Sequence, residues 1–168
     1  MNLLDTYGFP DLSMRRIATT LSVQPSALYW HVESKQDLCR GMAEVILNDL
    51  PTFPGELDRI PAWVARFHSL LTHHRHGSEL IWSVLSLQQW DQSLGLQVEQ
   101  GLREAGIPDV HALSAARGLI HLILGHCFDD DQRHQGQQLG ATPTIFPDSS
   151  LGLDDATSIF LAGLKTLR

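Results

Sequence analysis

The chain has 168 residues, of which 43% are hydrophobic and 18% charged, and its formal net charge is −7. This composition is typical of a globular protein with a real core, and it excludes collagen-like, disordered and disulfide-rich classes. Apolar runs are too short to span a bilayer and no basic-then-apolar leader opens the chain, so we expect a cytoplasmic protein with no membrane partner. Cys39 and Cys127 form no CxxC motif, so we expect two reduced thiols.

The distribution of charge restricts any contact with nucleic acid. A protein of this net charge has no global positive field to hold a phosphate backbone. Residues 1–50 carry four basic and six acidic side chains, whereas residues 51–168 carry eight and thirteen. Most of the excess acid therefore lies beyond residue 50, and a DNA contact has to be local.

The first elements expected along the chain are two short helices. Alternating strand patterns are nearly absent and apolar residues recur at helical spacing, so we expect an all-α protein. Ser13 can cap a helix whose apolar stripe reaches Leu21. Pro25 suits the first turn of a second helix, which we expect to continue to about His31.

A third helix and a linker complete this part of the chain. Ser34 with Asp37 resembles a capping box, and the apolar stripe that follows predicts a longer helix that stops at Pro51. Residues 51–55 contain two prolines and a glycine, which cannot continue a helix. We therefore expect one domain at 1–50, a linker at 51–55 and a second domain at 56–168.

The second domain is expected to be helical throughout. Apolar stripes predict one helix from Ile60 to near Gly77, one over about 78–89 and one that closes at Gly106. Asp109 can cap a further helix that is apolar on most sides, so it is buried by its own domain or by a second subunit. The polar stretch from about 132 to 152 predicts a long loop before a last amphipathic helix.

The first two helices and their turn of three or four residues form a helix-turn-helix pattern, whose second helix lies in the major groove of DNA. Short helix pairs are also ordinary packing elements, so spacing alone leaves both interpretations open. The residue content is more specific, and it is carried by four runs: Ser13-Met14-Arg15-Arg16-Ile17-Ala18, Val23-Gln24-Pro25-Ser26-Ala27, Leu28-Tyr29-Trp30-His31-Val32 and Ser34-Lys35-Gln36-Asp37-Leu38.

Together these runs resemble the DNA-binding domain of the tetracycline-repressor (TetR) family over about residues 3–50, and weaker similarity continues to Gln132. The resemblance implies an all-helical repressor that binds an operator. It implies a small three-helix helix-turn-helix domain, a larger helical domain for effector binding, and a homodimer formed mostly by the last long helices. Only residues 2–7 precede the expected helix stop at Gly8, so the first helix of the family is expected to be shortened here. Either the start is truncated or this domain is less stable, and a lost helix would put DNA affinity at risk.

The residues of the helix-turn-helix fit contact with DNA. Tyr29, Trp30 and His31 have polar tips that suit phosphates, although one or two could be core aromatics. Lys35 follows a capping serine at a helix N-terminus, which favours a phosphate, and Arg15 can make a bidentate contact to guanine or remain a solvated surface arginine. The complete set of expected DNA contacts is Ser13, Arg15, Pro25, Ser26, Ala27, Tyr29, Trp30, His31 and Lys35.

The start of the second helix departs from the tetracycline repressor itself. Pro25, Ser26 and Ala27 offer little hydrogen bonding, although Pro25 and Ala27 can touch thymine methyl groups. We therefore expect a different operator.

The second domain is expected to hold a mostly apolar or aromatic effector. Large side chains with two polar groups fit a ligand pocket, although each aromatic could instead be core and Arg117 and His121 could pair across a subunit interface. The expected lining is Trp63, Phe67, Trp82, Leu85, Trp90, Val98, Arg117, His121 and Phe128.

The tetracycline repressor holds its drug as a magnesium chelate through a histidine and an acidic residue. In an ungapped alignment Asp129 matches the acidic position, whereas Ile81 occupies the position of the histidine. One carboxylate is a poor magnesium site, so we do not expect a magnesium–tetracycline complex to be the natural inducer.

Metal and catalytic sites find little support in the sequence. His73, His74 and His76 lie at a polar helix end, where histidines also help to terminate a helix. His126, Asp130 and His134 share one helical face and leave a metal-dependent enzyme open as an alternative, beside a ligand-binding protein that has lost DNA binding. The motifs GxSxG, HExxH and a Gly-rich phosphate loop are missing, so we assign no enzyme activity, no metal and no cofactor.

Overall fold

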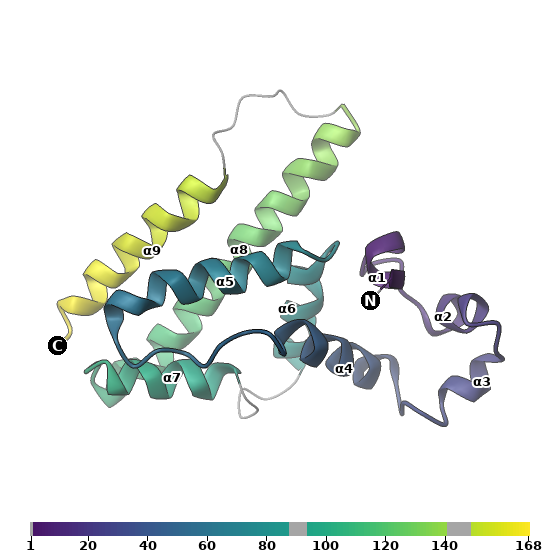
Figure 1. Ribbon diagram of the computed structural model, residues 1–168, viewed down its shortest axis with the longest axis horizontal. Helices are drawn as coiled ribbons and strands as arrows, with labels where there is room; N and C mark the ends of the chain where they lie inside the picture. Colours follow the sequence, from purple (N-terminus) through teal and green to yellow (C-terminus); the bar gives the residue numbers. More distant parts are fainter. Residues whose placement is uncertain (1, 88–93, 141–148) are drawn as a thin grey trace.

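The computed structural model describes residues 2–87, 94–140 and 149–168, and every regular element in these ranges is a helix (Figure 1). The all-α prediction is therefore confirmed. The N-terminal helices are α1 (Asn2–Tyr7), α2 (Met14–Thr20), α3 (Pro25–Leu28) and α4 (Lys35–Leu47). The remaining α-helices are α5 (Ile60–Thr72), α6 (Gly77–Leu87), α7 (Leu94–Glu104), α8 (Asp109–Gln138) and α9 (Ser149–Lys165).

The helix-turn-helix lies at one end of the molecule, with α2 and α3 beyond α4 (Figure 1). Ser13 caps α2, because its Oγ accepts a hydrogen bond from the backbone N–H of Arg16 at 3.2 Å. The helix α3 is a single turn that ends at Leu28, shorter than the sequence predicted. Beyond Leu28 the chain continues in turns, in which the N–H groups of His31 and Val32 donate to the carbonyl of Leu28, before the extended residue Ser34 caps α4.

The connection between α5 and α6 also differs from the prediction. The helix α5 ends at Thr72 and not near Gly77, because the chain turns sharply over residues 73–76. Gly77 then passes so close to the carbonyl oxygen of Leu71 that a Cβ atom at this position would overlap it. This turn sets α6 against α5 and α8.

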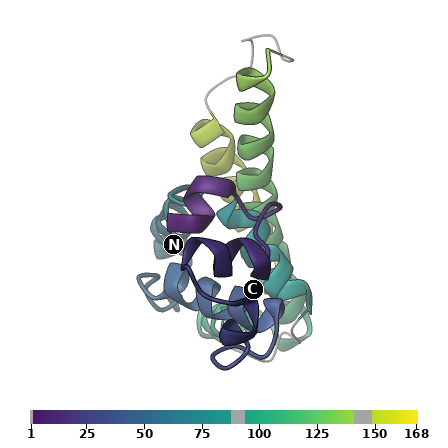
Figure 2. The same ribbon diagram turned by 90° about the vertical axis from the view of Figure 1, so that its right-hand side faces the viewer.

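The largest difference from the predicted elements concerns the C-terminal part of the long helix α8. The predicted loop over 132–152 is wrong at both ends, because α8 continues to Gln138 and α9 begins at Ser149. Polar partners hold the additional turns, since Arg133 pairs with Asp130 and Gln135 contacts His76. Figure 2 shows the C-terminal end of α8 extending beyond the other helices.

Two clusters of buried side chains form the interior. The larger cluster joins α5, α7, α8 and α9, and it includes Phe53 of the linker, whose ring lies 4.9 Å from that of Trp63. The smaller cluster contains Leu4, Cys39, Ile46 and Leu80, so it packs α1 and α4 against α6. Both clusters take side chains from either side of the linker, and the division at 51–55 stays a prediction.

Two further observations concern the described part of the chain. Cys39 and Cys127 are both buried and free, as expected from the sequence. No helix among these residues has both the length and the apolar content that a bilayer crossing needs.

Candidate DNA-binding surface and ligand groove

The aromatic residues after α3 are strongly exposed. Trp30 is 88% exposed and Tyr29 is 55% exposed, and His31 beside them is exposed as well. Pro25 and Ser26 are also exposed at the start of α3. Large apolar side chains are normally buried in a core, so this surface has the exposed aromatic character of a binding surface.

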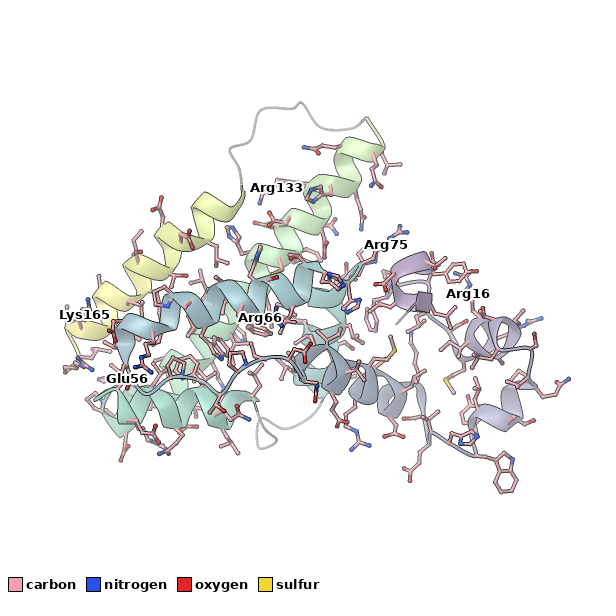
Figure 3. All side chains as sticks on the ribbon, in the orientation of Figure 1. Arg16, Glu56, Arg66, Arg75, Arg133 and Lys165 are labelled. Atoms are coloured by element: carbon pink, nitrogen blue, oxygen red, sulfur yellow. The ribbon has the colours of Figure 1, made fainter. Side chains whose placement is uncertain are left out.

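The two arginines of α2 differ in their surroundings. The guanidinium of Arg16 lies 4.8 Å from the ring centroid of Tyr7 and 3.8 Å from a carboxylate oxygen of Asp11. Figure 3 labels Arg16 at the end of the molecule opposite Lys165. The side chain of Arg15 is exposed and makes no ion pair or hydrogen bond within the described residues. Arg16 is therefore held by its own chain, whereas Arg15 is available to a ligand.

The N-terminus of α4 is capped as the sequence predicted. Oγ of Ser34 accepts from the backbone N–H of Asp37 at 3.1 Å, and Asp37 in turn accepts from the N–H of Glu33 at 3.2 Å. Lys35 follows in the first turn, with its ammonium 5.4 Å from the ring centroid of Phe9. Packing against Phe9 fixes where Lys35 presents its charge.

A groove of 810 Å³ runs between α6 and α8. Phe9, from the loop between α1 and α2, closes part of it. Its apolar wall consists of Phe9, Trp82, Leu87, Leu124 and Phe128. Its polar side chains are Ser78, Glu79, Ser83, Ser86 and Gln132. The volume and the mostly apolar lining match those of small-molecule sites.

The structure separates the predicted ligand residues into groups. Trp82 and Phe128 line the groove, and the ring of His121 lies 5.1 Å from that of Trp82. Arg117 is exposed on α8, and Leu85 is half-buried against the larger cluster.

The other predicted ligand residues do not join the groove. Trp63, Phe67 and Val98 are buried in the larger cluster and do not line it. Trp90 lies outside the described residues.

Sequence reasoning missed several residues of the groove. Glu79 and Ser86 lie three before and four after Trp82, so helical spacing places them on the face of that tryptophan, and Ser83 lies one turn after Glu79. Phe9 carried no comparable signal, because only tertiary packing brings the loop after α1 against α6.

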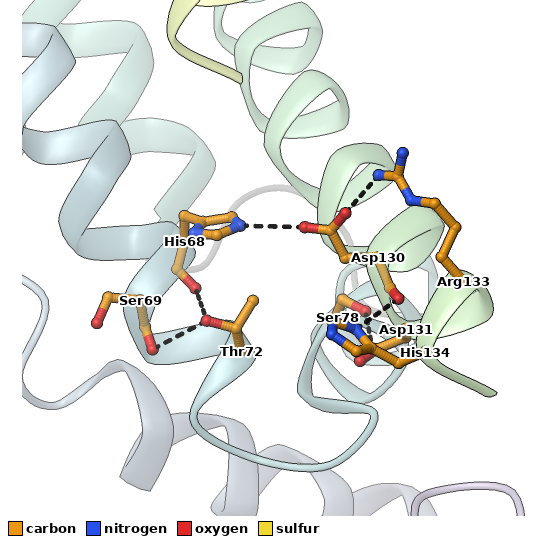
Figure 4. Close-up of polar contacts among 8 residues, drawn as sticks. All are labelled: His68, Ser69, Thr72, Ser78, Asp130, Asp131, Arg133 and His134. Atoms are coloured by element: carbon orange, nitrogen blue, oxygen red, sulfur yellow. Dashed lines mark hydrogen bonds and ion pairs between the residues drawn. The ribbon is translucent and has the colours of Figure 1, made fainter. Parts of the chain in front are cut away.

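A partly buried polar network connects α5, α6 and α8 (Figure 4). Nε2 of His68 lies 3.6 Å from a carboxylate oxygen of Asp130, which also pairs with Arg133. Ser78 donates a hydrogen bond to Asp131 at 3.1 Å. Burial raises the pKa of Asp131, and the hydrogen bond from Ser78 opposes that rise.

The proposed metal ligands on α8 do not converge. The carboxylate of Asp130 is taken by Arg133 and His68, and Nδ1 of His134 lies 2.9 Å from the backbone carbonyl of Asp130. His126 faces His68, with ring centroids 6.4 Å apart. Across the described ranges, no group of three or more His, Cys, Asp or Glu side chains is placed to hold a metal ion.

The histidines between α5 and α6 join distant parts of the chain. Nδ1 of His74 lies 2.9 Å from Oδ1 of Asp5, and Arg75 donates to the carbonyl of Thr6 at 3.2 Å. His76 is buried beside Gly8 and contacts Gln135. This corner therefore connects α1 to the extension of α8. The sequence had indicated only that these histidines help to terminate a helix.

The two positions compared with the tetracycline repressor's magnesium site also lie in different surroundings. Ile81 is buried in the larger cluster, whereas Asp129 is exposed on α8.

Comparison with known proteins agrees with this arrangement. Residues 1–42 match the family model described as "Bacterial regulatory proteins, tetR family". The chain is 28% identical to the tetracycline repressor protein class E of Escherichia coli, an alignment that covers 99% of this chain and 84% of that protein.

Solved structures share the fold over nearly the whole length. The crystal structure of Mycobacterium smegmatis BioQ superposes with a TM-score of 0.87 at 28% identity and covers 99% of this chain and 93% of that one. The structure of BioQ with its natural double-stranded DNA operator gives a TM-score of 0.75 at 29% identity, over 97% and 91% of the two chains. The chain therefore carries a match to the tetR family of bacterial regulatory proteins at residues 1–42, and it is similar to a tetracycline repressor over nearly its whole length.

Proposed function

We propose that the chain is a ligand-responsive transcriptional repressor, which binds a palindromic operator as a homodimer and releases it when a small molecule enters the groove between α6 and α8. The observation that carries this function is the exposed surface around α3, where Trp30 is 88% exposed on a helix-turn-helix. The similar tetracycline repressor and the operator complex of BioQ support it.

The proposed DNA contacts are of two kinds, those that position the protein on the phosphates and those that recognise the bases. Tyr29, Trp30, His31 and Lys35 contact phosphates and fix the orientation of the domain. Arg15 reaches a base edge, because its guanidinium has no partner of its own within the described residues. The remaining contacts come from the first residues of the two helices, namely Ser13, Pro25, Ser26 and Ala27.

The homodimer forms through α8 and α9. Val110 and Leu113 on α8 and Ile159 on α9 are exposed large apolar side chains, and a second copy of the same surface would bury them. Two symmetric recognition helices then reach half-sites roughly 34 Å apart.

Phe9 links the groove to the DNA-binding surface. Its ring lines the groove and also lies beneath the ammonium of Lys35, 5.4 Å away. A ligand that displaces Phe9 would move the support of Lys35, and with it a phosphate contact. Release of the operator therefore needs no long pathway through the core.

The effector is a mostly apolar or aromatic molecule held against Trp82 and Phe128. Asp129 is exposed and Ile81 is buried in the core, so their side chains offer no paired magnesium ligands. We therefore expect tetracycline with magnesium to leave the Tm unchanged, whereas planar apolar compounds raise it without metal. Tight magnesium-dependent binding of tetracycline by calorimetry would contradict this expectation.

A protein that binds operator DNA works in the cytoplasm, so we propose this location for the chain. The proposed mechanism needs no catalytic step. The experiment that tests the function is selection of operator sequences by the purified chain, followed by a gel shift with the DNA upstream of its own gene. Specific retention of a palindromic site is expected. Failure to retain any sequence, with ligand binding intact, would instead favour a ligand-binding protein that has lost DNA binding.

A further inference from the structure

The groove between α6 and α8 contains one charged side chain among the described residues that line it, the carboxylate of Glu79. Its other polar side chains are serine hydroxyls and the amide of Gln132, and its walls are aromatic and aliphatic. A site with a single negative charge and no lining cation attracts a positively charged ligand and repels an anion.

Glu79 has no partner of its own within the described part of the chain. It is half-buried, and neither an ion pair nor a hydrogen bond engages its carboxylate. It lies in the first turn of α6, where the helix dipole favours a negative charge. An unpaired carboxylate in partly desolvated surroundings costs free energy. A cationic ligand would supply the ionic partner that Glu79 lacks within the described residues.

Three basic side chains lie near the groove without lining it, namely Lys35, whose ammonium lies over the ring of Phe9, and Arg75 and His76. Arg75 and His76 line a smaller cavity of 370 Å³ that shares Glu79 with the groove. Arg75 donates to the carbonyl of Thr6, and His76 contacts Gln135. Asp131 adds to the negative character nearby, since it accepts a hydrogen bond from Ser78 in the groove wall.

Two exposed aromatic side chains complete the recognition surface. Trp82, one helical turn after Glu79, is 45% exposed, and Phe128 on α8 is 44% exposed. Their ring faces can stack against an aromatic ligand and attract a cation. The hydroxyls of Ser83 and Ser86 lie on the same side of α6 and can accept hydrogen bonds from a protonated nitrogen.

From these observations we infer that the groove selects an aromatic cation, whose charge lies on Glu79 and whose rings lie against Trp82 and Phe128. This inference rests on the proposed function, because it defines the chemical class of the effector. It predicts that affinity for aromatic ligands depends on their charge. A neutral ligand gains only the contact with the aromatic side chains, and an anionic ligand is in addition repelled by the carboxylate of Glu79.

The test compares three probes with one ring system and different charges: 1-naphthylmethylamine, which is protonated at neutral pH, the neutral 1-naphthalenemethanol, and 1-naphthaleneacetic acid, which is ionised at neutral pH. Binding to the full chain is measured by calorimetry and by quenching of tryptophan fluorescence. We expect the amine to bind about tenfold more tightly than the alcohol and the acid to bind most weakly.

Glu79→Gln removes the charge and keeps the shape of the side chain. It should weaken binding of the amine about tenfold and leave binding of the alcohol within about twofold. The matched control is Glu44→Gln, an exposed glutamate on α4 outside the groove, which should change neither. Trp82→Ala should weaken the binding of both the amine and the alcohol, because both lose the contact with the aromatic ring.

The inference is overturned if Glu79→Gln binds the amine as tightly as the parent chain does, if the three probes bind alike, or if none binds. Operator release by the same probes is followed in parallel by fluorescence anisotropy. Release by the neutral alcohol as strong as by the amine would leave the repressor function standing while removing the charge preference. Selective binding of the amine without any operator binding would remove the repressor function instead.

Discussion

At the scale of single residues, neighbours decide which charged groups are available for function. Arg15 and Arg16 are adjacent, yet only Arg16 is held by Tyr7 and Asp11. Lys35 is supported on Phe9 but keeps its ammonium outside the core. Sequence reasoning selected Arg15 and Lys35 from their places in the helix-turn-helix, and the structure adds the contacts that separate Arg15 from its neighbour.

Lys35→Ala and Arg15→Ala should affect DNA binding differently. Loss of the phosphate contact of Lys35 should weaken binding to all DNA sequences alike. It should also reduce the slope of the logarithm of the binding constant against the logarithm of salt concentration by about one. Loss of Arg15 should cost about 1–3 kcal/mol and relax one operator position. Anisotropy titrations at several salt concentrations check both, and parental binding by both variants would contradict the assigned interface.

Asp131 makes stability depend on pH in a definite direction. Burial raises its pKa above the ordinary value of 3.8, so the folded state binds the proton more strongly than the unfolded state. Its contribution is therefore fully present below the unfolded pKa and is lost as the pH rises through the raised folded pKa.

Asp131→Asn should remove this loss, because the amide oxygen can still accept the hydrogen bond from Ser78 without placing a charge at this half-buried position. The variant should gain stability relative to the parent as the pH rises from acidic to neutral, as measured by urea unfolding. Asp129→Asn, at the neighbouring exposed position, is the matched control. A difference between Asp131→Asn and the parent that stays constant with pH would show that Asp131 is not the titrating group.

At the scale of elements, caps and turns define the ends of the helices, while tertiary contacts extend them. Ser13 and Ser34 cap α2 and α4 as their sequence patterns predict. The C-terminal turns of α8 have no apolar stripe, and Gln135 in them contacts His76 of the corner between α5 and α6. The corner at 73–76 therefore packs against both α1 and α8.

Gly8→Ala should weaken the contact of α1 with this corner. Gly8 has a φ of +76°, and a Cβ atom there would overlap Nδ1 of His76. We expect a loss of about 1–3 kcal/mol in the free energy of unfolding, read as a lower Tm. The double variant with His76→Ala should recover the steric part of the loss. A Gly8→Ala chain as stable as the parent would contradict this close contact.

At the scale of the whole molecule, exposed apolar surface lies on α8 and α9 and the exposed aromatics follow α3, at separate ends of the molecule (Figure 1). This separation would let the proposed dimer surface join two copies while the proposed DNA-binding surface reaches the operator. The groove lies between them, with Phe9 as its boundary toward the DNA-binding helices.

Ile159→Glu should separate the proposed homodimer. Ile159 is 74% exposed on α9, and a charge at the centre of an apolar interface should raise the dimer dissociation constant by about tenfold or more. Light scattering at micromolar concentration should give a dimer for the parent and for the control Val45→Glu, which changes an exposed residue of α4. A monomeric parent would contradict the proposed assembly.

The sequence by itself determined the features that depend on neighbours in the chain. Apolar spacing and capping residues predicted the helices, and the runs around Leu28–Val32 indicated the family. Tertiary structure alone decided which large side chains are core and which are exposed. Trp63 and Trp82 have similar sequence patterns, but Trp63 is covered by Phe53 and Phe67, whereas Trp82 borders the groove.

The same limit applies to the groove and to the end of α8. Phe9 and Glu79 are 70 positions apart, and their shared role follows from packing that no local pattern encodes. The polar turns after Asp130 have the sequence pattern of a loop, because the partner of Gln135, His76, is remote in sequence. Local propensity is a sum over near neighbours, whereas burial and polar pairing depend on contacts that exist only once the chain has folded.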